Sequence, residues 1–234
     1  MGERRAMVFG ATGYTGREVV RLLVETGAQT VAHVRPGSSR GAEWAEVFRE
    51  QGAEVVECPW EEGVLMEALR EAEPEVVFFL VGTTKSADRR SEEDLSYEAI
   101  DYGLCRMLVD ACVATGLGPR FVYLSAMGVR EGSRSAYYQA RYRAEEAVKE
   151  SGLSYVIARP GMITGPDRDE SRPMERAGGV VSDVIAGGLR LMGAGRLADR
   201  YGATDNTELA TALVELGLGE GESQVVEAED LKRH

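Results

Sequence analysis

The chain has 234 residues, of which 44% are hydrophobic, and this suits a single domain with a substantial core. Its formal net charge of −12 disfavours a nucleic-acid-binding surface, because lysine and arginine dominate phosphate binding. No apolar run reaches the roughly 18 residues of a membrane span, and the apolar stretch near the N-terminus is too short for a signal peptide. A cytoplasmic protein without membrane contact is therefore expected.

Cysteine and histidine are scarce. The cysteines Cys58, Cys105 and Cys112 fit no zinc-site spacing, and we expect small core residues in a reducing compartment. Because His33 and His234 are the two histidines, a histidine-based metal site or a Ser-His-Asp triad is not expected. The sequence therefore predicts no metal centre.

The loop Gly10-Ala-Thr-Gly13-Tyr-Thr-Gly16 follows a short apolar run and opens a helical pattern, the context that a dinucleotide phosphate site requires. Gly10 allows a sharp turn, Gly13 leaves room for a pyrophosphate, and Gly16 lets the helix pack closely on the strand. Amides at the helix N-terminus would face the phosphates. A glycine triplet alone could be a structural turn, and its position at the first βα junction favours the cofactor site. The expected contacts are Gly10, Thr12, Gly13, Tyr14, Thr15 and Gly16.

The second expected strand, 30–34, ends at Arg35. An acidic residue at this position would hold the two ribose hydroxyls of NAD, whereas a guanidinium with nearby hydroxyls suits the 2′-phosphate of NADP. NADP is therefore favoured over NAD, and the alternative is a solvated loop with two surface arginines. The side chains expected at the phosphate are Arg35, Ser38 and Arg40.

Strand and helix patterns then alternate along the chain. Helices are expected at 42–51, 62–71, 95–115 and 136–150, and further strands at 54–57, 75–81, 120–124 and 154–158. With right-handed crossovers, six such strands predict an α/β fold with a Rossmann-type, doubly wound parallel sheet. The nearly continuous apolar strand 75–81 would bring Val81, Gly82 and Thr83 to the cofactor crevice. The helix 95–115 could pack on the core or on a second subunit, which leaves a homodimer open.

The alternation stops after Gly161. Residues 164–179 are rich in glycine, proline and charge, and they are interpreted as a loop or lid over the crevice. Two helices, at 180–191 and 206–216, and a short tail complete the expected elements. The chain 1–234 is therefore interpreted as one NAD(P)-binding domain, with 162–234 forming the lid and a small helical and loop extension on the substrate side.

A candidate catalytic group follows the fifth strand. Ser125 ends that strand, Tyr137 begins the next helix, and Arg141 lies one turn further on the same face. The cation would favour the phenolate and lower the pKa of Tyr137, while the serine hydroxyl could polarise a substrate carbonyl. The alternatives are a strand-end cap for Ser125 and a packing role for Tyr137, which clusters with Tyr138 and Tyr142.

These motifs resemble the atypical branch of the short-chain dehydrogenase/reductase superfamily, which carries an extended glycine motif. The resemblance rests on the glycine loop, Val81-Gly-Thr-Thr84, Leu124-Ser-Ala-Met-Gly128, Tyr137-Tyr-Gln-Ala-Arg141 and Arg159-Pro-Gly161. Within that branch, three stretches are similar to the NmrA-like subgroup with bacterial relatives of a Tat-interacting, NADPH-binding protein. They are Gly82-Thr-Thr-Lys85, Ile100-Asp-Tyr102 and the segment 165–173.

The resemblance implies a Rossmann fold, an NADP(H) site and a serine, tyrosine and lysine catalytic set, with Ser125 and Tyr137 in the first two positions. Arg141 stands where the family has lysine. Arginine keeps the positive charge but cannot pass on a proton. The further positions that the resemblance assigns to the cofactor are Val81, Gly82, Thr83, Tyr137, Arg141 and Pro160.

The leading hypothesis is an NADP(H)-dependent oxidoreductase that reduces a small carbonyl or quinone-like substrate, with Tyr137 as the acid. Arg141 motivates a second hypothesis, a non-catalytic NADP(H)-binding redox sensor that acts through a protein partner. A third is an enzyme similar to nucleotide-sugar epimerases, which retains its cofactor. The first predicts substrate-dependent NADPH oxidation, the second predicts binding alone, and the third predicts no net NADPH consumption.

Overall fold

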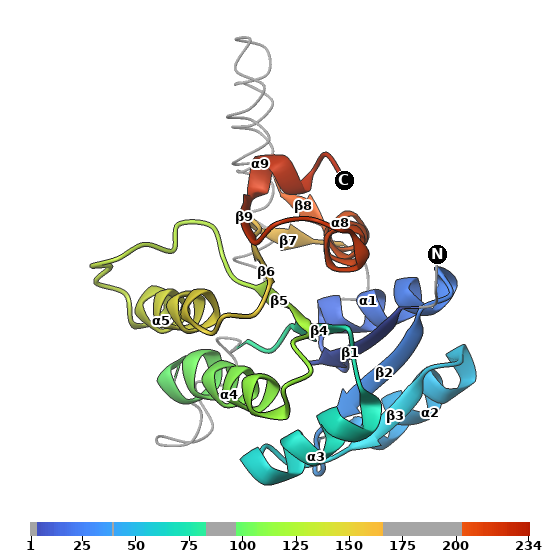
Figure 1. The fold of residues 1–234 in the computed structure, drawn as a ribbon. Coiled ribbons are helices and arrows are strands. Elements are labelled where there is room, and N and C mark those ends of the chain that lie inside the picture. The colour runs from blue at the N-terminus through green and yellow to red at the C-terminus, as the bar shows by residue number, and fades with distance from the viewer. Residues whose placement is uncertain (1–3, 39, 83–96, 166–202) are drawn as a thin grey trace.

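The structure is a computed structural model that describes residues 4–38, 40–82, 97–165 and 203–234 (Figure 1). Seven strands form one sheet in the order β3-β2-β1-β4-β5-β6-β9, and every neighbouring pair is parallel. The strands are β1 (Arg5–Phe9), β2 (Gln29–Val34), β3 (Glu54–Glu57), β4 (Val76–Phe79), β5 (Arg120–Leu124), β6 (Tyr155–Arg159) and β9 (Gln224–Glu227). This order reverses direction between β1 and β4, which confirms the predicted Rossmann-type fold.

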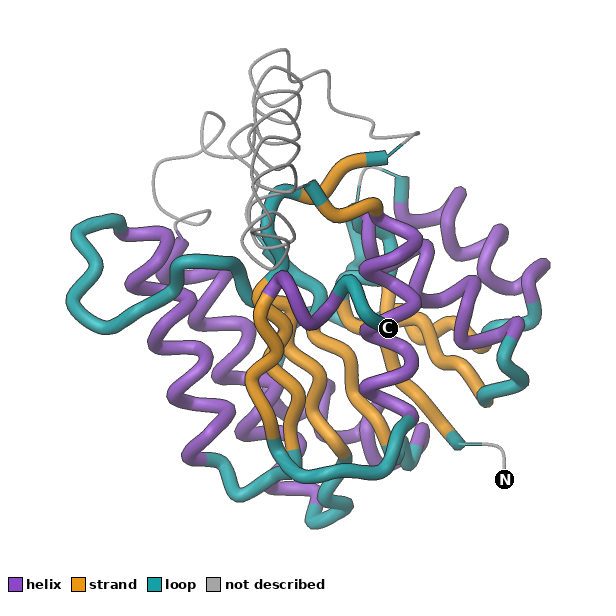
Figure 2. The backbone as a smooth tube through the Cα atoms, turned by 90° about the horizontal axis from the view of Figure 1, so that it is seen from above, coloured by secondary structure: helices purple, strands orange, loops and turns teal. Residues whose placement is uncertain are grey.

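Helices cover both faces of the sheet (Figures 1 and 2). One face packs against α1 (Tyr14–Glu25), α2 (Gly41–Gln51) and α8 (Asn206–Leu218), and the other against α3 (Glu62–Ala72), α4 (Cys105–Thr115) and α5 (Ala136–Glu150). Successive strand residues alternate between the two apolar clusters, as Phe78 and Phe79 of β4 show. Because both faces are covered, β4 is fully buried, as its apolar sequence predicts.

The cysteines lie in the core, as the sequence predicts. Cys58, Cys105 and Cys112 are free thiols, and all three are buried in the cluster beneath α3 and α4. Burial raises the pKa of each thiol, that of Cys112 to about 12, so they stay protonated. Within the described residues, no group of three or more metal-ligating side chains comes together, and no helix is long and apolar enough to cross a membrane.

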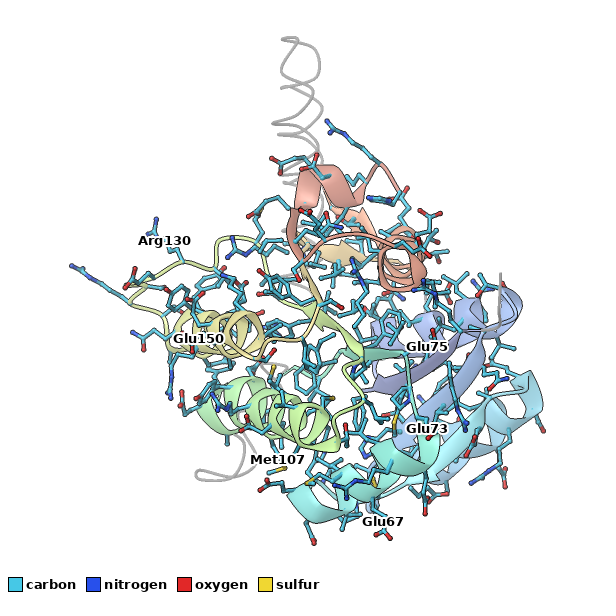
Figure 3. The ribbon with its side chains drawn as sticks, in the orientation of Figure 1. Glu67, Glu73, Glu75, Met107, Arg130 and Glu150 are labelled. Carbon is cyan, nitrogen blue, oxygen red and sulfur yellow. The ribbon has the colours of Figure 1, made fainter. Side chains whose placement is uncertain are left out.

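Acidic side chains account for the net charge, and several of them are exposed on the helices of one layer. Glu67, Glu73 and Glu150 project from the helical layer and from the loops that follow its helices (Figure 3), and all three are exposed. The first turn of α1, which follows the glycine loop, holds no acidic residue, so the net charge of the chain does not exclude an anionic cofactor there.

Two regions differ from the sequence-based expectation. The helix expected at 95–115 contains a π-helical stretch, η2 (Glu98–Leu104), that continues into α4. The expected tail instead contains the strand β9 and the short helix α9 (Ala228–Leu231), so the prediction of a simple tail was wrong. The C-terminal extension therefore supplies a helix and a strand to the main α/β layers.

The predicted lid adjoins a small second sheet. Strands β7 (Ile163–Thr164) and β8 (Thr204–Asp205) pair in parallel and bring the chain back to α8. From residue 166 onward the expected lid at 164–179 lies outside the described residues, as does the helix expected at 180–191.

Candidate dinucleotide site

The glycine loop has the close backbone packing that its sequence predicts. Gly10 has a φ of +84°, and a Cβ there would lie 2.8 Å from the carbonyl carbon of Leu80. A Cβ on Gly16 would overlap the carbonyl oxygen of Gly10 and lie 2.9 Å from the Cα of Ala11. Both positions therefore require glycine, because the obstructing atoms belong to the backbone.

The start of α1 suits an anion. Its N-cap residue, Gly13, makes no side-chain capping hydrogen bond, and the first turn holds no acidic residue. The first amides of a helix lack intrahelical partners, and the helix dipole favours negative charge at this end. The residues present therefore fit the pyrophosphate of a dinucleotide.

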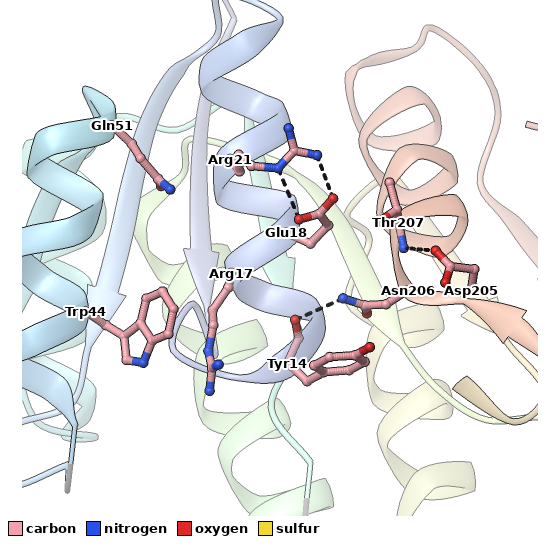
Figure 4. Close-up of a pocket in the computed structure, with 9 residues that line it drawn as sticks. All are labelled: Tyr14, Arg17, Glu18, Arg21, Trp44, Gln51, Asp205, Asn206 and Thr207. Atoms are coloured by element: carbon pink, nitrogen blue, oxygen red, sulfur yellow. Dashed lines mark hydrogen bonds and ion pairs between the residues drawn. The ribbon is translucent and has the colours of Figure 1, made fainter. Parts of the chain in front are cut away.

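Two loop side chains point away from the expected cofactor position. The hydroxyl of Thr15 donates to Oδ1 of Asn206 at 2.8 Å, and Nδ2 of Asn206 donates to the carbonyl oxygen of Tyr14 at 3.1 Å. The Tyr14 ring lies toward the start of α8 (Figure 4). The hydroxyl of Thr15 therefore links the glycine loop to α8, and the cofactor contact predicted at this position would be made by the backbone. No sequence motif indicated this role for Asn206.

Asn206→Ala is expected to weaken the binding of NADPH and NADH by a similar factor, about three- to tenfold. The substitution removes two hydrogen bonds that hold the start of α1, and both nucleotides share the pyrophosphate that binds there. Nucleotide titration by calorimetry measures this. Thr211→Ala is the matched control, because its hydroxyl bonds to Thr207 within the same helix. A selective loss of NADPH binding in Asn206→Ala would contradict a role at the pyrophosphate.

The loop after β2 brings together the three residues predicted to hold a 2′-phosphate. Arg35 is exposed directly after the strand, and a turn links its carbonyl oxygen to the amide of Ser38 at 3.2 Å. Arg40 forms two hydrogen bonds with Glu43, at 2.7 and 2.9 Å, on the exposed start of α2. The three therefore lie at the β2 end of the crevice, where Arg40 already has an acidic partner.

The candidate catalytic serine has a different partner from the one expected. Ser125 is buried, and its hydroxyl donates to Oε1 of Glu145 at 2.6 Å. Glu145 is fully buried and also accepts two hydrogen bonds from Arg159, at 2.5 and 2.9 Å. Because the Ser125 hydroxyl donates its hydrogen bond to this carboxylate, it does not donate to a substrate carbonyl in this arrangement, and the expectation that Ser125 polarises the substrate is corrected.

Arg141 lies beside Tyr137, as the helical spacing predicts, but its guanidinium is engaged on several sides. It donates to the carbonyl oxygen of Leu124 at 2.7 Å, pairs with the buried carboxylate of Asp101 at 2.9 Å, and lies 4.8 Å from the centre of the Tyr137 ring. A Cβ on Gly82 would lie 2.6 Å from this guanidinium. Arg141 therefore lies against the backbone of the crevice and acts chiefly to position its neighbours.

The predicted direction of the Tyr137 pKa shift was wrong. Burial raises the pKa of Tyr137 and outweighs the opposing effect of the Arg141 guanidinium, while Asp101 raises it further. The main physical reason is desolvation of the phenolate, and the ion pair adds to it because Asp101 offsets part of the Arg141 charge that was expected to stabilise the phenolate. Tyr137 is therefore a neutral phenol at neutral pH.

The remaining predicted cofactor positions lie at the ends of the central strands. Val81 and Gly82 lie two and three residues after the end of β4. Pro160 directly follows β6, and its carbonyl oxygen accepts a hydrogen bond from the amide of Met127 at 2.9 Å. Thr83 lies outside the described residues. Carboxyl ends of parallel strands border the dinucleotide crevice in this fold, so the described positions line its expected edge.

The fold, the glycine loop and the open start of α1 together define a Rossmann-type dinucleotide-binding protein. Residues 10–186 match the family described as NAD(P)H-binding. The chain therefore belongs to that family.

Named relatives agree with this assignment. Protein fmp52-1, mitochondrial, of Aspergillus terreus is 33% identical over 146 residues, which cover 62% of this chain and 58% of that protein. The ceramide reductase of Caulobacter vibrioides is 28% identical over 164 residues, which cover 70% and 48%. The chain thus spans about half the length of these relatives.

A solved structure shows the same fold. The UDP-Glc/GlcNAc 4-epimerase of Campylobacter jejuni superposes with a TM-score of 0.70, covering 98% of this chain and 82% of that one, at 12% identity. At that identity the likeness concerns the fold and not the substrate.

Proposed function

We propose that this protein is an NADP(H)-dependent oxidoreductase that reduces a small carbonyl or quinone-like substrate. The observation that carries the proposal is Tyr137, a half-buried neutral phenol packed on the Arg141 guanidinium where that group meets Gly82 at the crevice. Arg35 at the end of β2 supports NADP(H) as the nucleotide. A reductase activity is also supported by the similarity to the protein named ceramide reductase.

The proposed division of labour uses the residues as the structure places them. A bound reduced nicotinamide would supply the hydride. Tyr137 would donate its phenolic proton to the substrate oxygen, and Arg141 would hold the ring in position through its bond to the Leu124 carbonyl and its pair with Asp101. Ser125 would orient the end of β5 through Glu145 and would not polarise the substrate.

The raised pKa of Tyr137 predicts a directional pH dependence. Reduction needs the phenol, which is present at all pH values below that pKa, so its rate should stay nearly constant from pH ~6 to ~8. Alcohol oxidation needs the phenolate, so its rate should rise about tenfold per pH unit over the same range. Rate measurements in both directions test this, and an oxidation rate that is flat near neutral pH would contradict it.

The activity itself is tested by substrate-dependent NADPH oxidation across a panel of small carbonyls and quinones. Tyr137→Phe should lower kcat at least about 100-fold, because it removes the proton donor and keeps the ring. Tyr138→Phe is the matched control on the same helix and in the same aromatic cluster, and it should retain activity. Equal activity of both variants would exclude Tyr137 as the acid.

A second candidate is supported by the same geometry. Ser125 donates its hydrogen bond to Glu145, and Arg141 is bound to Leu124 and Asp101, so two of the three predicted catalytic side chains already have protein partners. This arrangement suits a protein that binds NADP(H) and signals its redox state to a partner. Nucleotide binding without turnover on any substrate of the panel would favour that function.

A further inference from the structure

A tryptophan with two arginines over its ring lies beside the glycine loop. Arg17, in the first turn of α1, places its guanidinium carbon 4.2 Å from the ring centre of Trp44, and that of Arg40 lies 5.4 Å from the same centre. Trp44 is in the first turn of α2. The stack therefore joins the N-terminal ends of the two helices that flank the carboxyl end of β2.

The stack borders a pocket of about 260 Å³ between α1, α2 and the start of α8. Arg17, Trp44 and Tyr14 lie at the end nearest the glycine loop, whereas Arg21 and Glu18 lie one turn further along α1 (Figure 4). Arg21 and Glu18 form an ion pair at 2.6 Å, which offsets their charges. Asp205 adds a carboxylate on the α8 side of the pocket, and Arg17 is the lining cation that lies next to the glycine loop.

We infer that Arg17, held against Trp44, is a further selector of the 2′-phosphate of NADP(H); this rests on the proposed function. In this fold the adenosine ribose lies at the end of β2, and the first turns of α1 and α2 adjoin that position. Arg35 reaches it from the strand end, and Arg17 reaches it from α1. No sequence motif pointed to Arg17, which follows the last glycine of the loop.

Two contacts fix Arg17 before any ligand binds. Its Nε donates to the carbonyl oxygen of Thr12 at 2.9 Å, and its guanidinium plane packs on the indole. A guanidinium held in this way loses less conformational entropy when it binds a phosphate. Arg40 donates two hydrogen bonds to Glu43, whose carboxylate offsets its charge.

The indole nitrogen of Trp44 independently supports a ligand at this stack. Nε1 of Trp44 is buried and has no hydrogen-bond acceptor among the described residues. Buried donors are usually satisfied, so an unused donor at the base of this stack points to an acceptor that arrives with a ligand. A phosphate oxygen has that chemistry, and it also matches the charge of the two arginines.

The alternative is that Arg17 has only a structural role and holds α1 against α2. If the stack only held α1 against α2, its loss would weaken NADPH and NADH binding by the same factor, because both nucleotides use the same pyrophosphate site. If Arg17 reads the 2′-phosphate, its loss would act on NADPH alone. The ratio of the two affinities therefore separates the two roles without any measurement of turnover.

The experiment is calorimetric titration of wild type, Arg17→Gln and Arg17→Lys with NADPH and NADH. Arg17→Gln should weaken NADPH about tenfold or more and change NADH less than about twofold, and Arg17→Lys should recover part of the loss. Arg21→Gln is the matched control, since it removes one cation from the same helix and pocket and should preserve the affinity ratio.

The outcomes separate the two proposals. Equal weakening of both nucleotides in Arg17→Gln, or an unchanged affinity ratio, would overturn the role of Arg17 and leave NADP(H) binding intact. A wild-type protein that binds both nucleotides equally would overturn 2′-phosphate selection as a whole. Failure of wild type to bind either nucleotide would overturn the proposed function itself.

Discussion

Gly16→Ala is expected to abolish nucleotide binding and to lower the free energy of unfolding by about 3 kcal/mol or more. The added Cβ would overlap the carbonyl oxygen of Gly10 and press on the backbone of Ala11. Neither atom can move unless the loop leaves β1 or α1 tilts away from the sheet. Either movement displaces the amides that would face the pyrophosphate, so stability and binding should fall together.

Denaturant unfolding and NADPH titration measure the two effects of Gly16→Ala. Gly63→Ala is the matched control, because a Cβ at that helical position of α3 meets nothing within 4 Å. Alanine is the better helix former, so this variant should be unchanged or more stable by up to about 1 kcal/mol. Wild-type affinity for NADPH in Gly16→Ala would show that the loop does not hold the cofactor.

Glu145→Ala is expected to lower the free energy of unfolding by about 3–5 kcal/mol. The carboxylate is fully buried and accepts hydrogen bonds from Ser125 and Arg159, and Arg159 also pairs with Glu227 of β9 at 2.9 Å. Removing the carboxylate leaves the mostly buried guanidinium of Arg159 without its main partner. It also breaks the hydrogen bonds that connect α5 to the ends of β5 and β6. Loss of one member of a buried ion pair is costly because the remaining charge stays desolvated.

Glu146→Ala is the control for Glu145→Ala. It lies next in the same helix, and its partner is Lys149 in a partly exposed pair at 2.8 Å. Such pairs contribute about 0–1 kcal/mol, so this variant should unfold close to wild type. If thermal and denaturant unfolding showed equal stability for the two variants, the buried network would not be the anchor proposed for the end of β5.

Most of the fold could be predicted because local patterns and the global topology agree. Six strands combine an apolar run with a following turn, and the β4 sequence Val76-Val-Phe-Phe79 is buried on both faces, as its composition requires. The strand β9 was missed because Gln224-Val-Val-Glu227 has two apolar residues and follows a glycine- and glutamate-rich segment. It becomes a strand through its pairing with β6, which is a tertiary effect.

The candidate site could be predicted in part. The i,i+4 rule places Arg141 beside Tyr137, and extending the same spacing by another turn would have indicated Glu145. Asp101 could not be found in this way, because it lies in the π-helical stretch, where the α-helical spacing does not apply. Without Asp101 and the degree of burial, the sign of the Tyr137 pKa shift was not accessible from sequence.

The central claim is that this crevice binds NADP(H) in preference to NAD(H). The most direct test is titration of wild type and Arg35→Ala with NADPH and NADH under identical salt. We predict that wild type binds NADPH more tightly, and that Arg35→Ala weakens NADPH about tenfold while leaving NADH nearly unchanged. Absence of binding for both nucleotides to folded wild-type protein would contradict the account, and the glycine loop would then be a structural turn.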